Sequence, residues 1–77
     1  MKNFGNWLIE YGKTCVDKDT PLYDFADDFR MDCTYFLETD PANFETPAQV
    51  KERVYRYTSD SKVHEALNEL EDIWLNS

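Results

Sequence analysis

The sequence predicts an all-α protein, a small bundle of four or five helices that is closed by a long C-terminal helix. Apolar residues recur at helical spacing in four segments, and no segment alternates between apolar and polar residues as a strand would. Capping residues stand at the starts of these segments. The chain has 77 residues without repeats or low-complexity stretches, so we expect a single domain over residues 1–77.

The first helix is predicted over residues 3–11. Asn3 can cap the first free backbone N–H groups, and Gly12 can end the helix in a left-handed conformation. A loop is expected over residues 13–19, where no helical period is sustained. The inner face of this helix is predicted to comprise Phe4, Trp7, Leu8 and Tyr11.

The second helix is predicted to begin at Thr20 and Pro21, because Thr is a good N-cap and Pro is favoured in the first turn. Residues 34–45 are expected to form a connection. The run at 35–37 is too apolar for a solvated loop, so part of it is expected to cover the core, and Phe44 is expected to fold back onto the bundle. The apolar face of the second helix is predicted to comprise Leu22, Phe25, Ala26, Phe29 and Cys33.

A third helix is predicted to begin at Thr46, because Thr followed by Gln49 three residues later matches a capping box. It is expected to end at Thr58, with an inner face made of Val50, Val54 and Tyr57.

The last helix is predicted over residues 59–75, and it is the longest. Its polar face is acidic, whereas its apolar stripe needs the other three helices as cover. We therefore expect this stripe to be core and not a docking site. The stripe comprises Val63, Ala66, Leu67, Leu70, Ile73 and Trp74.

The net charge of −8 comes from 16 acidic and 8 basic residues. Attraction to phosphate supplies most non-specific affinity for nucleic acids, so this charge disfavours DNA, RNA and anionic membranes as partners. No apolar run approaches the ~18 residues that span a bilayer, and no signal peptide is recognisable. The expectation is a cytoplasmic protein.

Two cysteines, Cys15 and Cys33, lack the CxxC spacing of redox and zinc sites. A secreted domain of this size would usually carry more cysteines, so we expect both to be reduced thiols, with a single disulfide as the alternative. Cys33 continues the apolar face of the second helix, which indicates a core residue and not a nucleophile.

No arrangement of residues indicates catalysis. A calcium loop starting at Asp17 would need Gly in its sixth place and Glu in its twelfth, where the chain has Leu22 and Asp28. His64 is the only histidine and has no nucleophile or second metal ligand beside it in the sequence. The sequence therefore predicts no enzyme, no cofactor, no metal site and no small-molecule substrate.

The candidate contact residues lie on the second, third and last of the predicted helices. Asp24, Asp27 and Asp28 share one exposed face of the second helix, and Met31 lies in the middle of it. Methionine is common on adaptable binding surfaces, so a protein contact is the alternative to a merely solvated face. An acid–base pair is not expected, since an exposed face does not separate the pKa values of its carboxyl groups.

The third helix carries Arg53 and Arg56, which can accept an acidic partner surface, although Glu52 forms an i,i+4 pair with Arg56. A solvated face is the default interpretation.

The chain resembles the YozE-type, SAM-like family of small bacterial proteins. Similar segments are the aromatic opening at residues 4–11, the Phe25-Ala26-Asp27-Asp28 element, the step from Asp32 to Phe36, and the closing helix at residues 66–74. The chain departs from the family pattern around residues 35–45, where Tyr35-Phe36-Leu37 stands in place of Phe-Pro.

The resemblance implies a SAM-like bundle of four or five helices with no assigned activity. SAM domains mostly bind other proteins, often by docking the start of the last helix on an acidic middle surface of a neighbour. Here the first surface would include Asp60 and Lys62, and the second would be the face with Asp24, Asp28 and Met31. Lys62 is the only base in the first surface, so head-to-tail polymerisation is poorly supported.

Three functions remain in order of preference. The first is a protein-interaction module with an unknown protein partner. The second is an acidic, DNA-mimicking inhibitor of a nucleic-acid-binding protein, derived from a phage or mobile element. The third is a SAM-like nucleic-acid-binding domain, which the net charge of −8 disfavours.

Overall fold

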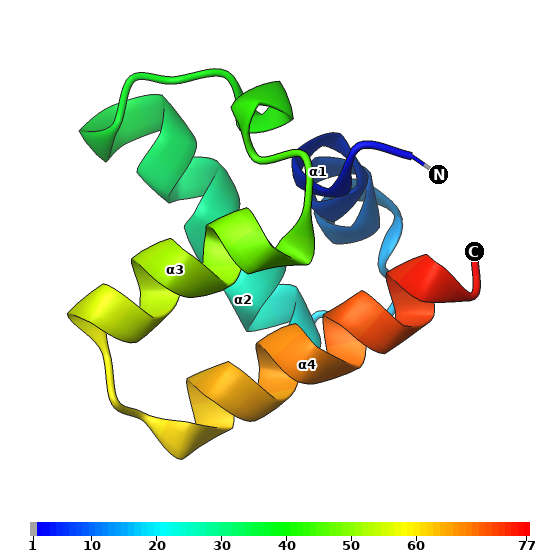
Figure 1. Cartoon of the computed structure of the whole chain (residues 1–77). Coiled ribbons are helices and arrows are strands. Elements are labelled where there is room, and N and C mark those ends of the chain that lie inside the picture. Colours follow the sequence, from blue (N-terminus) through cyan, green and yellow to red (C-terminus); the bar gives the residue numbers. More distant parts are fainter. Residues whose placement is uncertain (1) are drawn as a thin grey trace.

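Four α-helices build residues 2–77, the part of the chain that the computed structural model describes (Figure 1). No strand occurs in these residues, so the all-α prediction is confirmed. A π-helical segment, η1, continues α2, and a 3₁₀ turn, η2, precedes α3. The elements are α1 (Phe4–Thr14), α2 (Pro21–Met31), η1 (Asp32–Phe36), η2 (Pro41–Asn43), α3 (Pro47–Tyr57) and α4 (Ser61–Leu75).

The predicted capping residues stand at the starts of the helices. Asn3 Oδ1 accepts the backbone N–H of Asn6 at 3.0 Å, and Thr20 Oγ1 accepts that of Tyr23 at 3.2 Å. These bonds satisfy backbone donors that the first turn of a helix leaves free. The residue pattern therefore places the starts of α1 and α2 correctly.

The two later helices begin in the same way. Gln49 Oε1 accepts the backbone N–H of Thr46 at 2.9 Å, which is one half of the predicted capping box. The N-cap of α4 is Asp60, whose Oδ1 accepts the backbone N–H of Lys62 at 2.9 Å. The last helix thus begins at Ser61, two residues later than predicted, and remains the longest.

The prediction for the end of α1 is wrong, because the helix continues through Gly12 to Thr14. Gly12 has no positive φ. It lies where α1 packs on α2, and a Cβ built on it would be 3.5 Å from the Cβ of Ala26. The glycine is part of a helix–helix contact and not a helix terminator.

Gly5 has a sharper role. Its backbone N–H donates to Phe44 O at 2.7 Å, while the neighbouring Phe4 N–H donates to Glu45 O at 3.0 Å. A Cβ on Gly5 would lie 1.8 Å from the carbonyl oxygen of Pro41. The chain around η2 therefore forms a strap across the first turn of α1 that only glycine admits.

The expected connection at 34–45 begins inside helical structure, because η1 prolongs α2 to Phe36. The bond from Leu37 N to Asp32 O, 2.8 Å long, spans five residues and is the mark of a π-helical turn. Part of the run at 35–37 is expected to cover the core, and only Leu37 is half-buried, whereas Tyr35 and Phe36 are 66% and 75% exposed. Phe44 does fold back, with its ring 5.4 Å from that of Phe29.

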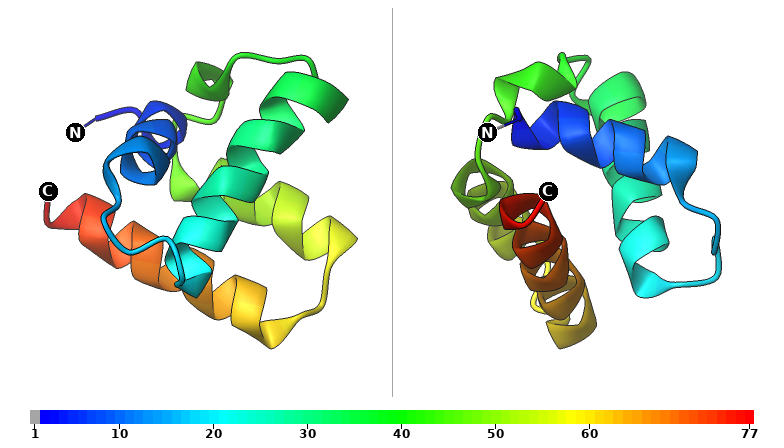
Figure 2. Two further views of the ribbon diagram at one scale, coloured as in Figure 1. Left: turned by 180° about the vertical axis from the view of Figure 1, so that it is seen from behind. Right: turned by 90° about the vertical axis from the view of Figure 1, so that its right-hand side faces the viewer.

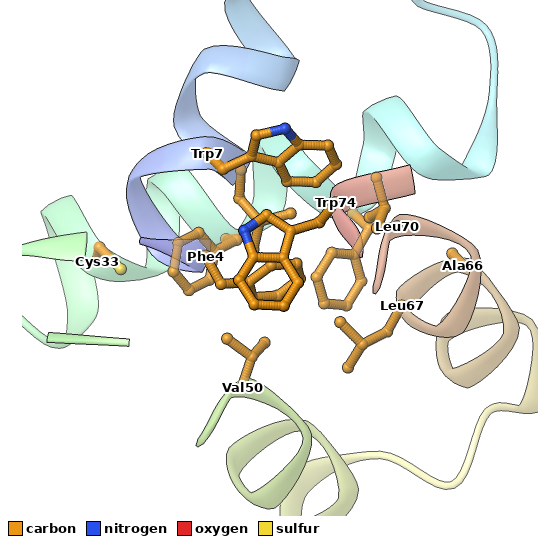
Figure 3. Close-up of a cluster of buried hydrophobic side chains, with 11 residues drawn as sticks. Phe4, Trp7, Cys33, Val50, Ala66, Leu67, Leu70 and Trp74 are labelled. Carbon is orange, nitrogen blue, oxygen red and sulfur yellow. The ribbon is translucent and has the colours of Figure 1, made fainter. Parts of the chain in front are cut away.

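The core is the apolar stripe of α4 and the side chains that the other helices lay on it (Figure 3). Leu67 and Leu70 are fully buried, as are Phe4 and Leu8 of α1. The prediction is wrong for Ile73 of this stripe, because its side chain is 40% exposed. The remaining core side chains are Trp7, Phe25, Phe29, Cys33, Val50, Ala66 and Trp74.

Aromatic rings fill the end of the core where α1 meets the end of α4. The ring of Phe4 lies 5.8 Å from that of Trp7 and 5.3 Å from that of Trp74, with the second pair edge to face. Trp74 Nε1 donates to Lys2 O at 2.8 Å, so the indole is both packed and hydrogen-bonded. This contact joins the first described residue to the last helix.

On the other side of the molecule α2 and α3 diverge. Each packs on α4, but the ends of α2 and α3 that lie farthest from the chain termini point apart (Figures 1 and 2). Cys15 and Cys33 are both free thiols, as expected, and Cys33 is buried at the base of η1.

Candidate docking groove

A groove of about 690 Å³ lies between α2, α3 and the first turns of α4. Its walls diverge because α4 separates two helices that touch each other little. Apolar side chains from all three helices form its floor, and these are Phe25, Phe29, Val50, Val54, Val63 and Ala66.

The floor of the groove is the outward continuation of the core. Val50 and Ala66 are only 2% and 3% exposed, whereas Val54 and Val63, one turn away on α3 and α4, are half-buried. Each helix thus keeps its apolar spacing beyond the point at which the helices stop covering one another. The sequence places more apolar side chains here than the neighbouring helices cover.

Two aromatic side chains stand at the lip. Phe36 extends from η1 and is 75% exposed, and Tyr57 ends α3 and is 70% exposed. The prediction that Tyr57 is an inner-face residue is therefore wrong, because the last turn of α3 lies apart from the first turn of α4 (Figures 1 and 2). The π-helical turn matters for Phe36, since the extra residue per turn changes the direction in which η1 presents it.

One wall of the groove is acidic. Asp24, Asp28 and Asp32 follow one another at four-residue spacing along α2 and into η1, and all three line the groove. Partial burial raises the pKa of the Asp28 carboxyl, and the negative charges of Asp27, Asp24 and Asp32 raise it further. Within residues 2–77, neither Asp24 nor Asp28 forms an ion pair.

The opposite wall carries two basic residues, Arg53 and Lys62. Arg53 is already engaged, because its Nε lies 3.9 Å from Asp32 Oδ2 and its guanidinium carbon is 4.8 Å above the ring of Tyr57. Lys62 has no ion pair within the described residues. The groove is therefore apolar at the floor, acidic along α2 and weakly basic along α3 and α4.

Half of the predicted contact residues lie at this groove. Asp24, Asp28, Arg53 and Lys62 come from three different helices and line one space. The sequence assigned them to separate surfaces, because the crossing of α2 and α3 over α4 is a tertiary feature that a helical wheel does not contain.

The other predicted contact residues lie elsewhere. Asp27 pairs with Arg30 at 3.1 Å and does not line the groove, and neither does Met31, although it is 39% exposed. Asp60 serves as the N-cap of α4.

Arg56 forms the predicted i,i+4 pair with Glu52 at 3.4 Å. The neighbouring Lys51 is paired instead with Glu71 of α4 at 2.6 Å. The hydrogen bond that Lys51 Nζ donates to Glu71 Oε1 raises the pKa of Lys51, because it stabilises the charged ammonium between α3 and α4.

Sequence reasoning missed Asp32, Phe36 and Tyr57 as groove residues. A signal for Asp32 was present, since Asp24, Asp28 and Asp32 repeat at four-residue spacing on one helix ridge. Nothing in the local pattern marks Phe36 and Tyr57 as exposed, because apolar residues at helical spacing normally indicate core.

The other chemically notable side chains are explained by packing. His64 Nε2 is 2.9 Å from Thr58 O, and its ring lies 4.2 Å from that of Tyr55. Burial raises the pKa of the Cys33 thiol, which opposes thiolate formation.

No group of three or more potential metal ligands gathers within residues 2–77. None of the helices in this part of the chain is both long and apolar enough to cross a membrane. No family model, no curated protein and no solved structure matches the chain.

Proposed function

We propose that the chain is a protein-interaction module that docks a segment of a partner protein in the groove between α2, α3 and α4. The observation that carries this proposal is the open apolar floor with two exposed aromatic side chains, Phe36 and Tyr57, at its lip. Large aromatic residues at the edge of an apolar depression are typical anchors of protein interfaces.

The extent of the exposed surface favours a polypeptide ligand. The groove volume falls in the range of about 300–1,000 Å³ that small-molecule sites also have. A compact ligand on the floor would leave the outer faces of Phe36 and Tyr57 in water, since these side chains are 75% and 70% exposed. A peptide segment lying across the floor reaches both lip residues and removes their apolar surface from water.

The proposal agrees with the resemblance to the YozE-type SAM-like family, because SAM domains mostly bind other proteins. It gives the chain a binding role and no catalytic one. We place the module in the cytoplasm, in keeping with its two free thiols.

A second candidate is an acidic inhibitor that imitates DNA. The regular row of Asp24, Asp28 and Asp32 supports it, together with the net charge of −8. Arg53 opposes it, because its guanidinium lies near Asp32 at one end of the row. Such an inhibitor would bind a DNA-binding protein in competition with duplex DNA, whatever residues line the apolar floor.

A peptide-display selection against the immobilised protein tests the proposed function. We expect enriched peptides to lose about tenfold or more of their affinity when Phe36→Ala and Tyr57→Ala are combined, as anchor residues do. The matched control combines Tyr35→Ala with Tyr55→Ala, two aromatic residues that are 66% and 47% exposed and lie outside the groove. Peptides whose affinity is indifferent to both pairs, or no enriched peptide at all, would overturn the proposal.

A further inference from the structure

We infer that the occupant of the groove is an amphipathic helix whose apolar face covers the floor and whose basic flank lies along α2. This inference rests on the proposed function and adds the chemical class of the partner. It follows from the shape of the floor, the charge of the α2 wall and the repeat of that charge.

The floor selects an apolar face. Val54 and Val63 are its half-buried side chains, and the buried Phe25 and Phe29 also line it. A helix that presents apolar residues at i, i+3, i+4 and i+7 fills such a groove without bringing unpaired backbone groups into it, because its own N–H and C=O groups are bonded internally.

The α2 wall selects basic side chains. Asp24 and Asp28 have no ion-pair partner within residues 2–77. Partial burial raises the pKa of Asp28, and repulsion by the neighbouring carboxylates raises it further. A Lys or Arg from the partner relieves this repulsion when the helix docks. An acidic or neutral helix in the same place would bury the carboxylates further without compensation.

The spacing of the acidic wall fits a helix. Asp24 and Asp28 are four residues apart on α2, which is a rise of about 6 Å. In a partner helix that runs along α2, basic residues at i and i+4 are separated by the same distance. Two ion pairs then form in register. An extended strand brings residues i and i+2 of one face to a similar spacing of about 6.6 Å, so the preference for a helix comes from the apolar floor, where a helix needs no outside partner for its backbone groups.

A second copy of the chain is a poor occupant. Each copy carries a net charge of −8, so two copies repel at long range. On the opposite wall Arg53 is held by Asp32 and Tyr57, which leaves Lys62 as the available base there. The charge balance around the groove therefore points to a basic partner.

Two designed peptides of about 16 residues, long enough to form a helix, test the inference. Both carry Leu at helical spacing on one face and Gln on the exposed face. One has Lys at i and i+4 along one flank, and the other has Glu at the same places. Isothermal titration calorimetry is expected to show that the Lys peptide binds the wild-type protein about tenfold more tightly than the Glu peptide.

A charge-matched pair of variants locates the effect. Asp24→Asn combined with Asp28→Asn is expected to weaken binding of the Lys peptide about five- to tenfold and to reduce its salt dependence. Asp17→Asn combined with Asp19→Asn changes the net charge equally at an exposed loop outside the groove, and is expected to leave the affinity nearly unchanged.

Each negative result of these experiments leads to a different conclusion. Equal affinity for the two peptides, or an equal loss in the two double variants, overturns the basic helix and leaves the docking groove standing if binding still depends on Phe36 and Tyr57. If neither peptide binds but display-selected peptides depend on those two residues, the helix inference alone is overturned. If neither peptide binds and no selected peptide uses the lip, the proposed function fails as well.

Discussion

At the α1 end of the molecule aromatic rings pack against one another away from water, whereas at the groove they remain in it. Phe4 is 0% exposed and contacts Trp7 and Trp74, while Phe36 is 75% exposed although it belongs to an equally apolar run. The difference lies in what covers each ring. At the α1 end the strap around η2 and the end of α4 close over the rings, and nothing within residues 2–77 does so at the groove.

Under the proposed function, the closed end serves stability and the open side serves binding. The closed end supplies the burial that a chain of 77 residues needs to stay folded, since small domains have little core to spare. In the proposed function, the open side is apolar surface that is fully buried only when a partner binds. Four predictions test the division, beginning with the largest expected effect.

The first compares the same substitution at the two places. Phe4→Ala removes a fully buried ring and should lower the free energy of unfolding by about 3–5 kcal/mol. Phe36→Ala removes an exposed ring and should change it by less than about 0.5 kcal/mol. Urea unfolding followed by far-ultraviolet circular dichroism measures both. Similar losses would show that the groove side carries as much stability as the core.

The second compares two glycines of α1. Gly5→Ala drives a Cβ into the backbone of the strap, 1.8 Å from Pro41 O, and should cost about 2–3 kcal/mol or more. Gly12→Ala places its Cβ at an ordinary 3.5 Å from the Cβ of Ala26, so higher helix propensity should gain up to about 1 kcal/mol. Opposite shifts of the urea midpoint are expected. An unchanged urea midpoint for Gly5→Ala would mean that the strap moves aside at little cost and does not close this end.

The third isolates the hydrogen bond of the last helix to the N-terminal segment. Trp74→Phe replaces an indole by a phenyl ring and removes the donor to Lys2 O. Trp7→Phe makes the same replacement at an indole that forms no side-chain hydrogen bond within residues 2–77. The bond should account for about 1 kcal/mol, or roughly 4–8 °C in Tm for a domain of this size. Equal Tm values for the two variants would assign the whole effect to packing.

The fourth and smallest concerns the groove wall. Because the pKa of Asp28 is raised above 3.8 in the folded protein, the folded state binds its proton more tightly than the unfolded state does. The charged carboxylate therefore destabilises the fold at neutral pH, and this penalty disappears as the pH falls through the raised pKa toward 3.8.

Asp28→Asn should accordingly stabilise the protein at pH 7, by no more than about 0.5 kcal/mol for a surface position. The advantage over wild type should fade at acidic pH, as measured by urea midpoints across a pH series. Asp17→Asn in the exposed loop is the control for loss of one charge. A gain that persists unchanged below pH 3.8 would exclude charge as its cause.

Local rules predicted the helices, and tertiary placement decided the exceptions. The start of α2 follows from Thr20 and Pro21 alone, because capping is a matter of adjacent residues. Glycine often ends a helix, but Gly12 lies against Ala26 of α2. The neighbours of Gly12 in the sequence do not indicate this contact. Tyr57 and Ile73 keep the period of a core residue, yet they are 70% and 40% exposed.

The groove was predictable only in pieces. Asp24, Asp28, Arg53 and Lys62 were recognisable as candidate contacts from charge and helix face. Their meeting in one space depends on the angle at which α2 and α3 cross α4, which is set by how side chains interlock and not by their order along the chain.

The bond between Trp74 and Lys2 also fixes where the molecule can be tethered. It holds the first described residue beside the last helix, and the start of α1 and the end of α4 lie across the molecule from the diverging ends of α2 and α3 (Figures 1 and 2). A surface, a label or a fused domain attached at either terminus therefore approaches from behind the groove. Immobilised through its ends, the protein presents the lip of Phe36 and Tyr57 to the solution.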